Sequence, residues 1–278
     1  MKANCVAESP PGIAAWLQKA RAWACSPPLQ PRAPLWLGSH EVGSLQAELV
    51  HALPTALLQA HGIALVAHES HEAGWRLVGR GDATADLNAL ALVLRDAGQC
   101  GPWRDEQLLV CDDEGKALAT VERGAVRPLG IATRAVYLVG ESEDGRVWVQ
   151  QRSEAKPNNP GMWDALVGGM VGAQDDVQQA LARETREEAG IALAQLSGLR
   201  HGGRLALSSP SDEAGGFGYM RERSDWFCAT LVAGLLPRNQ DGEVQAFALL
   251  EREQLVQWLL KDHFTPEAAL IMAAWLGW

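Results

Sequence analysis

GGMVGAQDDVQQALARETREEAGI, residues 168–191, is the most informative stretch of the chain. It contains five Asp and Glu side chains, and three of them, Glu184, Glu187 and Glu188, follow one another at helical spacing. On a helix that turns by about 100° per residue, positions i, i+3 and i+4 share one face. Like charges at this spacing repel by a few tenths of a kcal/mol. We therefore expect a divalent cation to offset the repulsion.

Carboxylates that share one helical turn form a hard-oxygen site suited to Mg²⁺ or Mn²⁺. The turn before the helix can add a backbone carbonyl, for which Gly169 is the candidate. Arg183 lies four residues before Glu187, so it can hold a carboxylate in place or reach back to Asp175. Gly190 has the position of a helix C-cap in the left-handed conformation. A solvated acidic face is the usual alternative for a charge run, but the register of all these residues favours a metal site.

The spacing of a glycine, an acid, an Arg-Glu pair, a Glu-Glu pair and a final glycine resembles the Nudix box. Two positions differ from that pattern. Asp175 stands where the family has Glu, which is longer by one methylene, and Thr185 stands at an apolar position. The last three glutamates of the box are intact, so the resemblance implies an active hydrolase. It also implies a Nudix α/β/α sandwich with a mixed sheet, within an α+β chain.

Further segments resemble one branch of the Nudix hydrolases. Its members carry an extra N-terminal domain and are related, in plants and yeasts, to enzymes associated with thiamine pyrophosphokinase. The segments are WRDEQLLV (103–110), ATVERGAVRPLGI (119–131), RSEAKPNNPGMWDALVGGMV (152–171) and DGEVQAFAL (241–249). This resemblance implies removal of phosphate from thiamine diphosphate, particularly its oxidised or otherwise damaged forms. The box itself implies only hydrolysis of a diphosphate linked to another moiety.

Diphosphate hydrolysis requires neutralised phosphates, an activated water and a stabilised leaving group. We expect Glu187 and Glu188 to be the main metal ligands and Glu184 to be a ligand or the general base. Arg183 belongs to the same catalytic group. A carboxylate from outside the box often contributes, and Glu243 is the candidate, with an exposed residue beside a turn as the alternative.

The segment before the box contains candidate substrate contacts. Arg152 and Lys156 are placed to contact terminal phosphate oxygens, and a solvated loop is the competing interpretation. Trp163 is a candidate to stack on a flat heterocycle, with core packing as the alternative. Asp164 is a candidate to accept a hydrogen bond from a substrate amino group.

The composition and length limit which partners, domains and cellular location are expected. The chain has 278 residues, which predicts two domains, an α+β unit at 1–128 and a Nudix domain at 129–278. A net charge of −10 weighs against a nucleic-acid polymer or an acidic membrane surface as partner. We expect a small-molecule diphosphate substrate, and a homodimer is left open. The five cysteines show no CxxC spacing, and residues 1–12 show no apolar core of a secretion signal. We therefore expect a cytoplasmic protein with reduced thiols.

Hydrophobic periodicity predicts the elements. Helices are expected at 12–25, 42–53, 54–62, 85–96, 251–261 and 266–276, besides the acidic helix. Strands are expected at 63–67, 75–79, 107–111, 117–122, 135–141, 146–152 and 165–171, within 223–234, and at 243–250. GGFGYMRERSD (215–225) is interpreted as a flexible loop, and His68-Glu69-Ser70-His71 as a surface loop rather than a metal motif.

Two other functions are consistent with an acidic helix of this kind. An enzyme similar to isopentenyl diphosphate isomerase would need a cysteine near the start of the site, and Cys111 and Cys228 lie far along the chain from the PGMWD segment at 160–164. A non-catalytic sensor of nucleotides or sugar phosphates is the second alternative. Degenerate Nudix-like domains usually lose the Glu pair, so its retention favours an enzyme.

Overall fold

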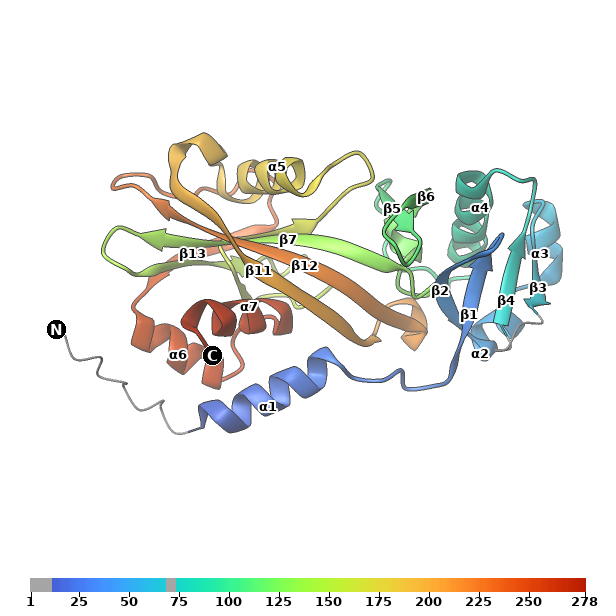
Figure 1. The fold of residues 1–278 in the computed structure, drawn as a ribbon, viewed down its shortest axis with the longest axis horizontal. Coiled ribbons are helices and arrows are strands. Elements are labelled where there is room, and N and C mark those ends of the chain that lie inside the picture. Colours follow the sequence, from blue (N-terminus) through green and yellow to red (C-terminus); the bar gives the residue numbers. More distant parts are fainter. Residues whose placement is uncertain (1–11, 69–73) are drawn as a thin grey trace.

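The computed structural model describes residues 12–68 and 74–278. Figure 1 shows two units placed end to end: a smaller sheet with helices from the first part of the chain, and a larger sheet with helices from the rest. The first helix, α1 (Ile13–Ala24), lies along the larger unit before the chain crosses to the smaller one. The expectations for residues 1–11 and for Glu69-Ser70-His71 lie outside the described residues.

The smaller unit is built on a four-stranded sheet in the order β2-β1-β4-β3. β1 pairs with β4 in parallel, and the other pairs are antiparallel. The elements are β1 (Arg32–Leu37), β2 (His40–Gln46), α2 (Ala47–Ala52), α3 (Thr55–Ala60), β3 (Ala64–His68), β4 (Gly74–Val78) and α4 (Ala83–Asp96), then the hairpin strands β5 (Gln107–Cys111) and β6 (Ala117–Glu122), and a 3₁₀ turn, Arg123–Ala125. One hydrophobic cluster, from Leu35 to Ile131, packs the sheet, α4 and the hairpin together.

The helix expected at 42–53 is wrong in its first half, where the chain forms β2 and only then the short α2. Spacing alone could not separate the two, because the apolar residues there fit a helical stripe. The partner strand decides: β2 pairs antiparallel with β1 along its whole length. Gly43 explains the close packing of β2, because a Cβ there would overlap the carbonyl oxygen of Leu129.

The larger unit contains a seven-stranded mixed sheet. Five strands follow the order β11-β12-β7-β8-β13, while β10 pairs with β7 and β9 with β8. Its strands are β7 (Ala132–Ser142), β8 (Val147–Arg152), β9 (Trp163–Asp164), β10 (Val167–Met170), β11 (Leu196–Ser211), β12 (Gly218–Leu231) and β13 (Val244–Leu250). Its helices are α5 (Val177–Ala189), α6 (Arg252–Leu260) and α7 (Pro266–Leu276), with 3₁₀ turns at Leu193–Gln195 and Ala214–Gly216. β12 runs parallel to β7, and the other pairs are antiparallel.

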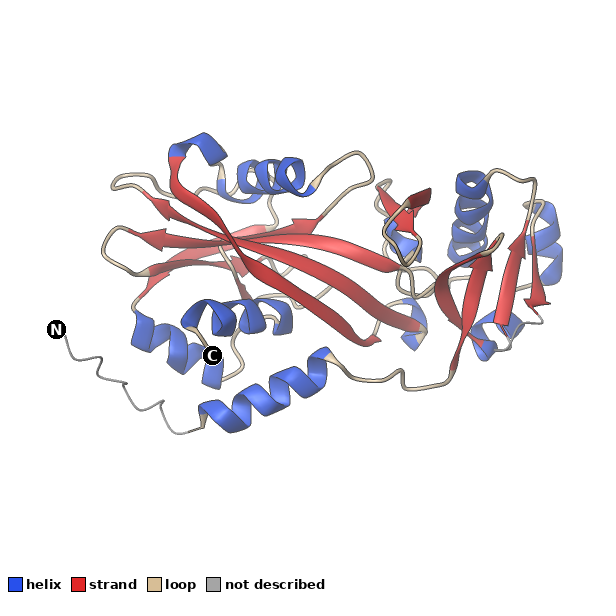
Figure 2. Cartoon of the chain, in the orientation of Figure 1, coloured by secondary structure: helices blue, strands red, loops and turns tan. Residues whose placement is uncertain are grey.

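Helices cover both faces of the larger sheet (Figure 2). α5 packs on one face through a cluster that contains Leu138 and Leu181. α6 and α7 pack on the other face through a cluster that contains Val149, Leu255 and Ile271. The structure is therefore an α/β/α sandwich with a mixed sheet, which confirms the expected fold class.

The loop expected at 215–225 is wrong for most of its length, because β12 begins at Gly218. β11, which periodicity did not predict, pairs with β12 on one side while β7 pairs with it on the other. Met220, Glu222 and Ser224 are buried on alternate positions of β12. The buried Glu222 hid the apolar alternation that identifies a strand.

The division of the chain at residues 128 and 129 stays a prediction. Contacts cross it: α1 packs against α7 and β11, and Trp16 belongs to the cluster beneath α6 and α7. Arg32 donates across it from Nη1 to the carbonyl of Phe217 at 2.7 Å. Across residues 12–68 and 74–278, no helix combines the length and the apolar character needed to cross a bilayer.

Candidate active site

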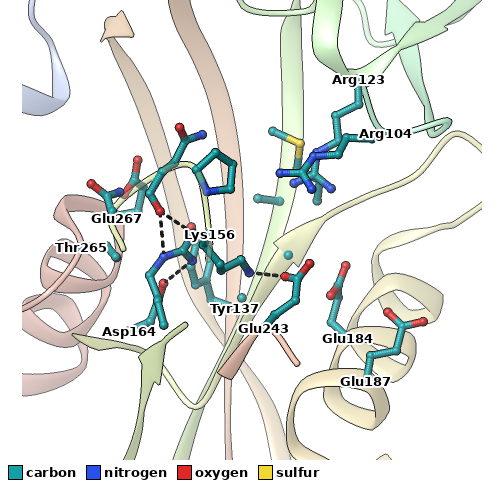
Figure 3. A pocket seen from close by; sticks show the side chains of 18 of the residues that line it. Arg104, Arg123, Tyr137, Lys156, Asp164, Glu184, Glu187, Glu243, Thr265 and Glu267 are labelled. Carbon is teal, nitrogen blue, oxygen red and sulfur yellow. Dashed lines mark hydrogen bonds and ion pairs between the residues drawn. The ribbon is translucent and has the colours of Figure 1, made fainter. Parts of the chain in front are cut away.

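A cavity of about 320 Å³ lies where β7, β10, α5 and the start of α7 meet the hairpin end of the smaller unit. Figure 3 shows Glu184 at one end with Arg104 and Arg123 near it, Glu267 at the opposite end, and Lys156 between them. Most side chains that line the cavity are charged. The cavity therefore suits a small ligand that carries charges of its own.

Local sequence signals define both ends of the acidic helix α5. Asp176 caps its start, since its side chain accepts from the backbone of Gln179 at 2.8 Å while the Gln179 side chain accepts from the backbone of Asp176 at 2.8 Å. Gly190 ends the helix with φ 67°, the left-handed C-cap that the sequence predicts. Thr185 is fully buried, and its hydroxyl donates to the Leu181 carbonyl at 2.6 Å. The hydroxyl group at this usually apolar position therefore has its hydrogen bond within the helix.

Arg183 organises the carboxylates of the box. Nε donates to Asp175 Oδ2 at 2.9 Å, and Nη1 donates to Glu184 Oε1 at 2.8 Å and to Glu187 Oε2 at 3.3 Å. Nη2 donates to the Met170 carbonyl at 3.1 Å. Asp175 therefore reaches Arg183 although it is shorter than the family's Glu. Burial lowers the pKa of Arg183, but the surrounding carboxylates raise it by more.

Glu184 lies directly against the backbone of β10. A Cβ at Gly169 would overlap the carboxyl group of Glu184, so only glycine leaves room for this side chain. Burial raises the pKa of Glu184 to about 7, although the neighbouring Arg183 opposes the shift. Gly168 and Gly169 lie in strand β10 and not in the turn expected before the helix. The close approach of β10 and α5 is the structural reason for glycine at position 169.

Glu188 is the most buried carboxylate of the box, with only 1% of its surface exposed. Its Oε2 accepts from Gln150 Nε2 and from the Gly168 backbone, both at 2.9 Å, and Oε1 lies 3.6 Å from Lys156 Nζ. Burial raises the pKa of Glu188 to about 8, and Lys156 opposes this shift. A positive charge placed beside Glu188 would favour its ionised form.

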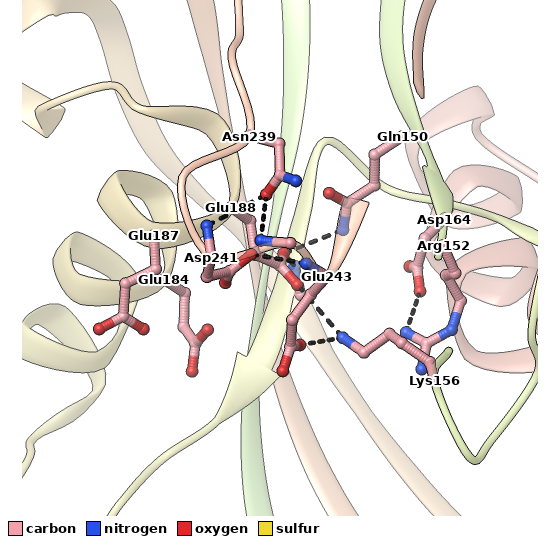
Figure 4. Close-up of polar contacts among 12 residues, drawn as sticks. Gln150, Arg152, Lys156, Asp164, Glu184, Glu187, Glu188, Asn239, Asp241 and Glu243 are labelled. Carbon is pink, nitrogen blue, oxygen red and sulfur yellow. Dashed lines mark hydrogen bonds and ion pairs between the residues drawn. The ribbon is translucent and has the colours of Figure 1, made fainter. Parts of the chain in front are cut away.

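Glu243, at the start of β13, faces the box from the opposite wall. It forms an ion pair with Lys156, and its carbonyl accepts from the Ser153 backbone at 2.8 Å. Burial raises the pKa of Glu243, but the contact with Lys156 lowers it by more, so the net pKa is below its usual value. Figure 4 shows Lys156 pointing between Glu243 and Glu188.

The carboxylates fit a hard cation by their chemistry, although they do not form a ready cluster. In the part of the chain that the structure describes, no three Asp, Glu, His or Cys side chains converge closely enough to hold a metal as they stand. Glu184 and Glu188 are both buried with raised pKa values, a state that a nearby cation reverses. Glu187 is about half exposed and lines the same cavity. Oxygen donors of this kind are those that Mg²⁺ and Mn²⁺ prefer.

Residues 131–274 match the NUDIX domain family, a range that runs from the loop before β7 to near the end of α7. The chain belongs to the Nudix family. The uncharacterized Nudix hydrolase YfcD of Escherichia coli is 28% identical over 170 residues, which are 60% of this chain and 84% of that protein. The enzyme class expected from the sequence is thereby confirmed at the level of the family.

Two further relatives cover similar shares of this Nudix chain. The uncharacterized protein YJR142W of Saccharomyces cerevisiae is 26% identical over 189 residues, 63% of this chain and 54% of that protein. The chain thus spans about half the length of the yeast protein. The crystal structure of DR0079 from Deinococcus radiodurans aligns with a TM-score of 0.47 at 21% identity, over 61% of this chain and 99% of that chain.

Three of the four predicted substrate residues line the Nudix pocket: Arg152, Lys156 and Asp164. Arg152 donates from Nη1 to Asp164 Oδ2 at 3.3 Å and from Nη2 to the Asn158 carbonyl at 2.9 Å. Asp164 also accepts from the Ala165 backbone at 2.8 Å. Asp164 therefore holds Arg152 in place, and its contact with a substrate amino group stays a prediction.

Trp163 packs in the core and does not line the pocket. Its ring lies 4.8 Å from that of Trp258, centroid to centroid, and it joins the hydrophobic cluster beneath α6 and α7. Its backbone N–H donates to the His263 carbonyl at 3.0 Å. The structure shows core packing, the stated alternative, for Trp163, and a stacking role on a substrate stays a prediction without support from this pocket.

Several lining residues of the Nudix pocket were not predicted. They are Arg104, Glu106, Arg123, Arg127, Tyr137, Glu222, Asp241, Thr265 and Glu267. Arg127 Nη2 and Glu222 Oε2 form a buried ion pair at 2.8 Å across 95 positions of sequence. No spacing rule connects residues so far apart. Arg104 and Arg123 do lie in segments that resemble the thiamine-associated branch, and that was the available signal.

The cysteines do not contribute to this pocket. Of the four in the described residues, Cys25, Cys100, Cys111 and Cys228, none lines it. Cys228 is buried among apolar side chains beneath α6 and α7. This weighs against the isomerase alternative, which needs a cysteine at the site.

Proposed function

We propose that the chain is a Mg²⁺- or Mn²⁺-dependent hydrolase that cleaves the diphosphate linkage of a small organic diphosphate and releases phosphate. One observation carries the proposal. Two carboxylates of the Nudix box, Glu184 and Glu187, and a set of basic side chains line a single charged cavity, and Glu188 lies buried behind it, 3.6 Å from Lys156 Nζ. Phosphoryl chemistry needs carboxylates that hold a metal cation and basic side chains that bind the phosphate oxygens.

Five residues are proposed to hold the metal: Gly169 through its carbonyl, and Glu184, Glu187, Glu188 and Glu243 through their carboxylates. A divalent cation bound there neutralises phosphate oxygens and lowers the pKa of a bound water. All of these residues come from one chain, so the proposed reaction does not require a second copy.

The chain's own side chains divide the remaining work. Arg183 keeps Glu184 and Glu187 oriented through its hydrogen bonds, and either carboxylate can accept the proton of the attacking water. Lys156 and Arg152 are proposed to bind the outer phosphate oxygens. Because Lys156 is paired with Glu243 in the present arrangement, substrate binding would exchange that partner for a phosphate.

For the organic part of the substrate we propose thiamine diphosphate or its oxidised or otherwise damaged forms. The resemblance of four segments to the thiamine-associated branch supports this choice. The pocket end remote from the box supports it as well, because Glu267 lies there (Figure 3). Carboxyl groups suit a ring system that carries a positive charge or an amino group.

A phosphate-release screen tests the proposal. Thiamine and oxythiamine diphosphate, nucleoside diphosphates, ADP-ribose and dinucleotides are each incubated with Mg²⁺ and with Mn²⁺. We expect the thiamine compounds to be cleaved fastest, and Glu187→Gln and Glu188→Gln each to reduce kcat by at least about 100-fold, because each change removes a charged metal ligand. Glu253→Gln, on the exposed start of α6, is the matched control. Equal rates for the Glu187 and Glu188 variants and the unmutated protein would refute the proposed reaction.

A further inference from the structure

The smaller unit contributes two arginines to the pocket of the larger one. Arg104 follows α4 in the loop that leads to β5, and Arg123 follows β6 directly. Both line the cavity, and Figure 3 shows them near Glu184 and Glu243. Arg123 Nη1 pairs with Glu106 Oε2 at 2.7 Å, and Glu106 lines the same cavity. Burial lowers the pKa of Arg123, but Glu106 and, to a smaller extent, Glu184 and Glu243 raise it by more.

Arg104 differs from every other basic residue of the pocket in its pairing. Arg123, Arg127, Arg152, Lys156 and Arg183 each form an ion pair with a carboxylate. Within residues 12–68 and 74–278, Arg104 forms none, and its side chain makes no hydrogen bond. A guanidinium that faces an acidic cavity with all its donors free is available to a bound anion.

The backbone beneath Arg104 is anchored by a hydrogen bond to a buried carboxylate and by contacts of its neighbours. Its N–H donates to Glu122 Oε1 at 2.8 Å, and Glu122 has only 1% of its surface exposed. On either side, Trp103 Nε1 donates to Asp105 Oδ1 at 2.7 Å, and the guanidinium of Arg95 lies 4.6 Å above the Trp103 ring. An anchored backbone limits the entropy that Arg104 loses when it binds a ligand.

The same segment is joined to the Nudix box. The Ala173 N–H, in the loop before α5, donates to the Gln107 carbonyl at 2.8 Å, and the Arg123 N–H donates to the Glu106 carbonyl at 2.8 Å. The two arginines are thus held in register with the loop that carries Asp175. These backbone hydrogen bonds, together with the packing of the smaller unit, determine where the two arginines lie relative to Glu184.

We propose that Arg104, assisted by Arg123, binds the phosphate oxygens of the substrate, so that the N-terminal unit completes the phosphate site of the Nudix domain. The inference rests on the proposed function, since it concerns the same diphosphate. Arg104 supplies a two-pronged donor that is free before binding. Arg123 adds positive charge while it keeps its contact with Glu106.

The test measures binding of methylenediphosphonate, a diphosphate analogue that cannot be hydrolysed, by calorimetry in the presence of Mg²⁺. We expect Arg104→Gln to weaken the affinity about tenfold or more, because a charged hydrogen bond to phosphate is lost. The affinity of Arg104→Lys is expected to lie between those of the unmutated protein and Arg104→Gln, because lysine keeps the charge but lacks the paired donors of the guanidinium. Arg104→Gln is also expected to make the affinity less sensitive to salt.

Arg80→Gln is the matched control, because Arg80 is an exposed arginine of the same unit that does not line the pocket. It should bind the analogue as the unmutated protein does. Equal affinity of the Arg104→Gln variant and the unmutated protein would overturn the inference, as would absence of measurable binding to the unmutated protein. Binding does not depend on turnover, so a protein that binds through Arg104 but cleaves none of the screened diphosphates would refute only the proposed function.

Discussion

At the scale of single residues, burial sets the chemistry of the acidic groups around the pocket. Glu267, at the start of α7, shows this apart from the proposed metal ligands. Burial raises its pKa to about 7, and the nearby carboxylates of Glu222 and Asp164 add to the shift while Arg127 opposes it. The folded protein therefore binds a proton at Glu267 that the unfolded chain, with a pKa near 4.5, releases at lower pH.

This difference predicts that the protein loses stability as pH rises from about 4.5 to about 7. Ionisation of Glu267 stabilises the unfolded state in that window, whereas it stabilises the folded state only at higher pH. Glu267→Gln should remove this loss. Between pH 5 and pH 8 the free energy of unfolding of the variant should therefore rise by on the order of 2 kcal/mol relative to that of the unmutated protein. Urea unfolding at both pH values measures it. A stability difference between the two proteins that does not change with pH would contradict the prediction.

At the scale of elements, the contact of β10 with α5 positions the box. The helix approaches the strand so closely that the carboxyl group of Glu184 occupies the space over Gly169. On its inner face α5 buries Ala180, Leu181 and Ala189 against the sheet. The small residue on the strand and the apolar face of the helix together fix where Glu184 lies.

Gly169→Ala is expected to leave the fold intact while it displaces the Glu184 carboxylate. The atoms in the way belong to the far end of a flexible side chain, so we expect the free energy of unfolding to change by less than about 1 kcal/mol. Mn²⁺ affinity should fall about tenfold or more, because a ligand is moved, and titration calorimetry measures it. Gly172→Ala is the control, since a Cβ there meets nothing closer than 3.6 Å. If both variants bound Mn²⁺ alike, the placement of Glu184 would not matter.

At the scale of the whole molecule, a buried polar network lies close to the junction of the two units. Arg127, at the end of the smaller unit, pairs with Glu222 on β12 of the larger unit, and both are buried. Thr133 joins them, with hydrogen bonds of 3.2 Å to Arg127 and 3.1 Å to Glu222. The network reaches the pocket wall, so the same residues connect the units and shape the site.

Arg127→Met should destabilise the protein by about 3 kcal/mol, because it leaves the Glu222 carboxylate buried without its partner. The double variant with Glu222→Leu should recover part of that loss, since an apolar pair carries no desolvation penalty. Urea unfolding followed by Trp fluorescence gives both values. Arg21→Met, at an exposed position of α1, is the control. A double variant no more stable than Arg127→Met alone would show that the unpaired charge is not the cause.

Local patterns in the sequence determined most of the elements and the box. The Gly190 C-cap of α5, the strands β5 and β6, and the register of Glu184, Glu187 and Glu188 depend on residues close together in the chain, and their spacing identifies them. Only the tertiary structure decided what depends on distant pairing. β2 and β12 are strands because partner strands satisfy their backbones, and Trp163 packs in the core because Trp258 lies against it. Arg104 faces the pocket because hydrogen bonds between distant segments bring it there, and spacing along the chain contains no information on such contacts.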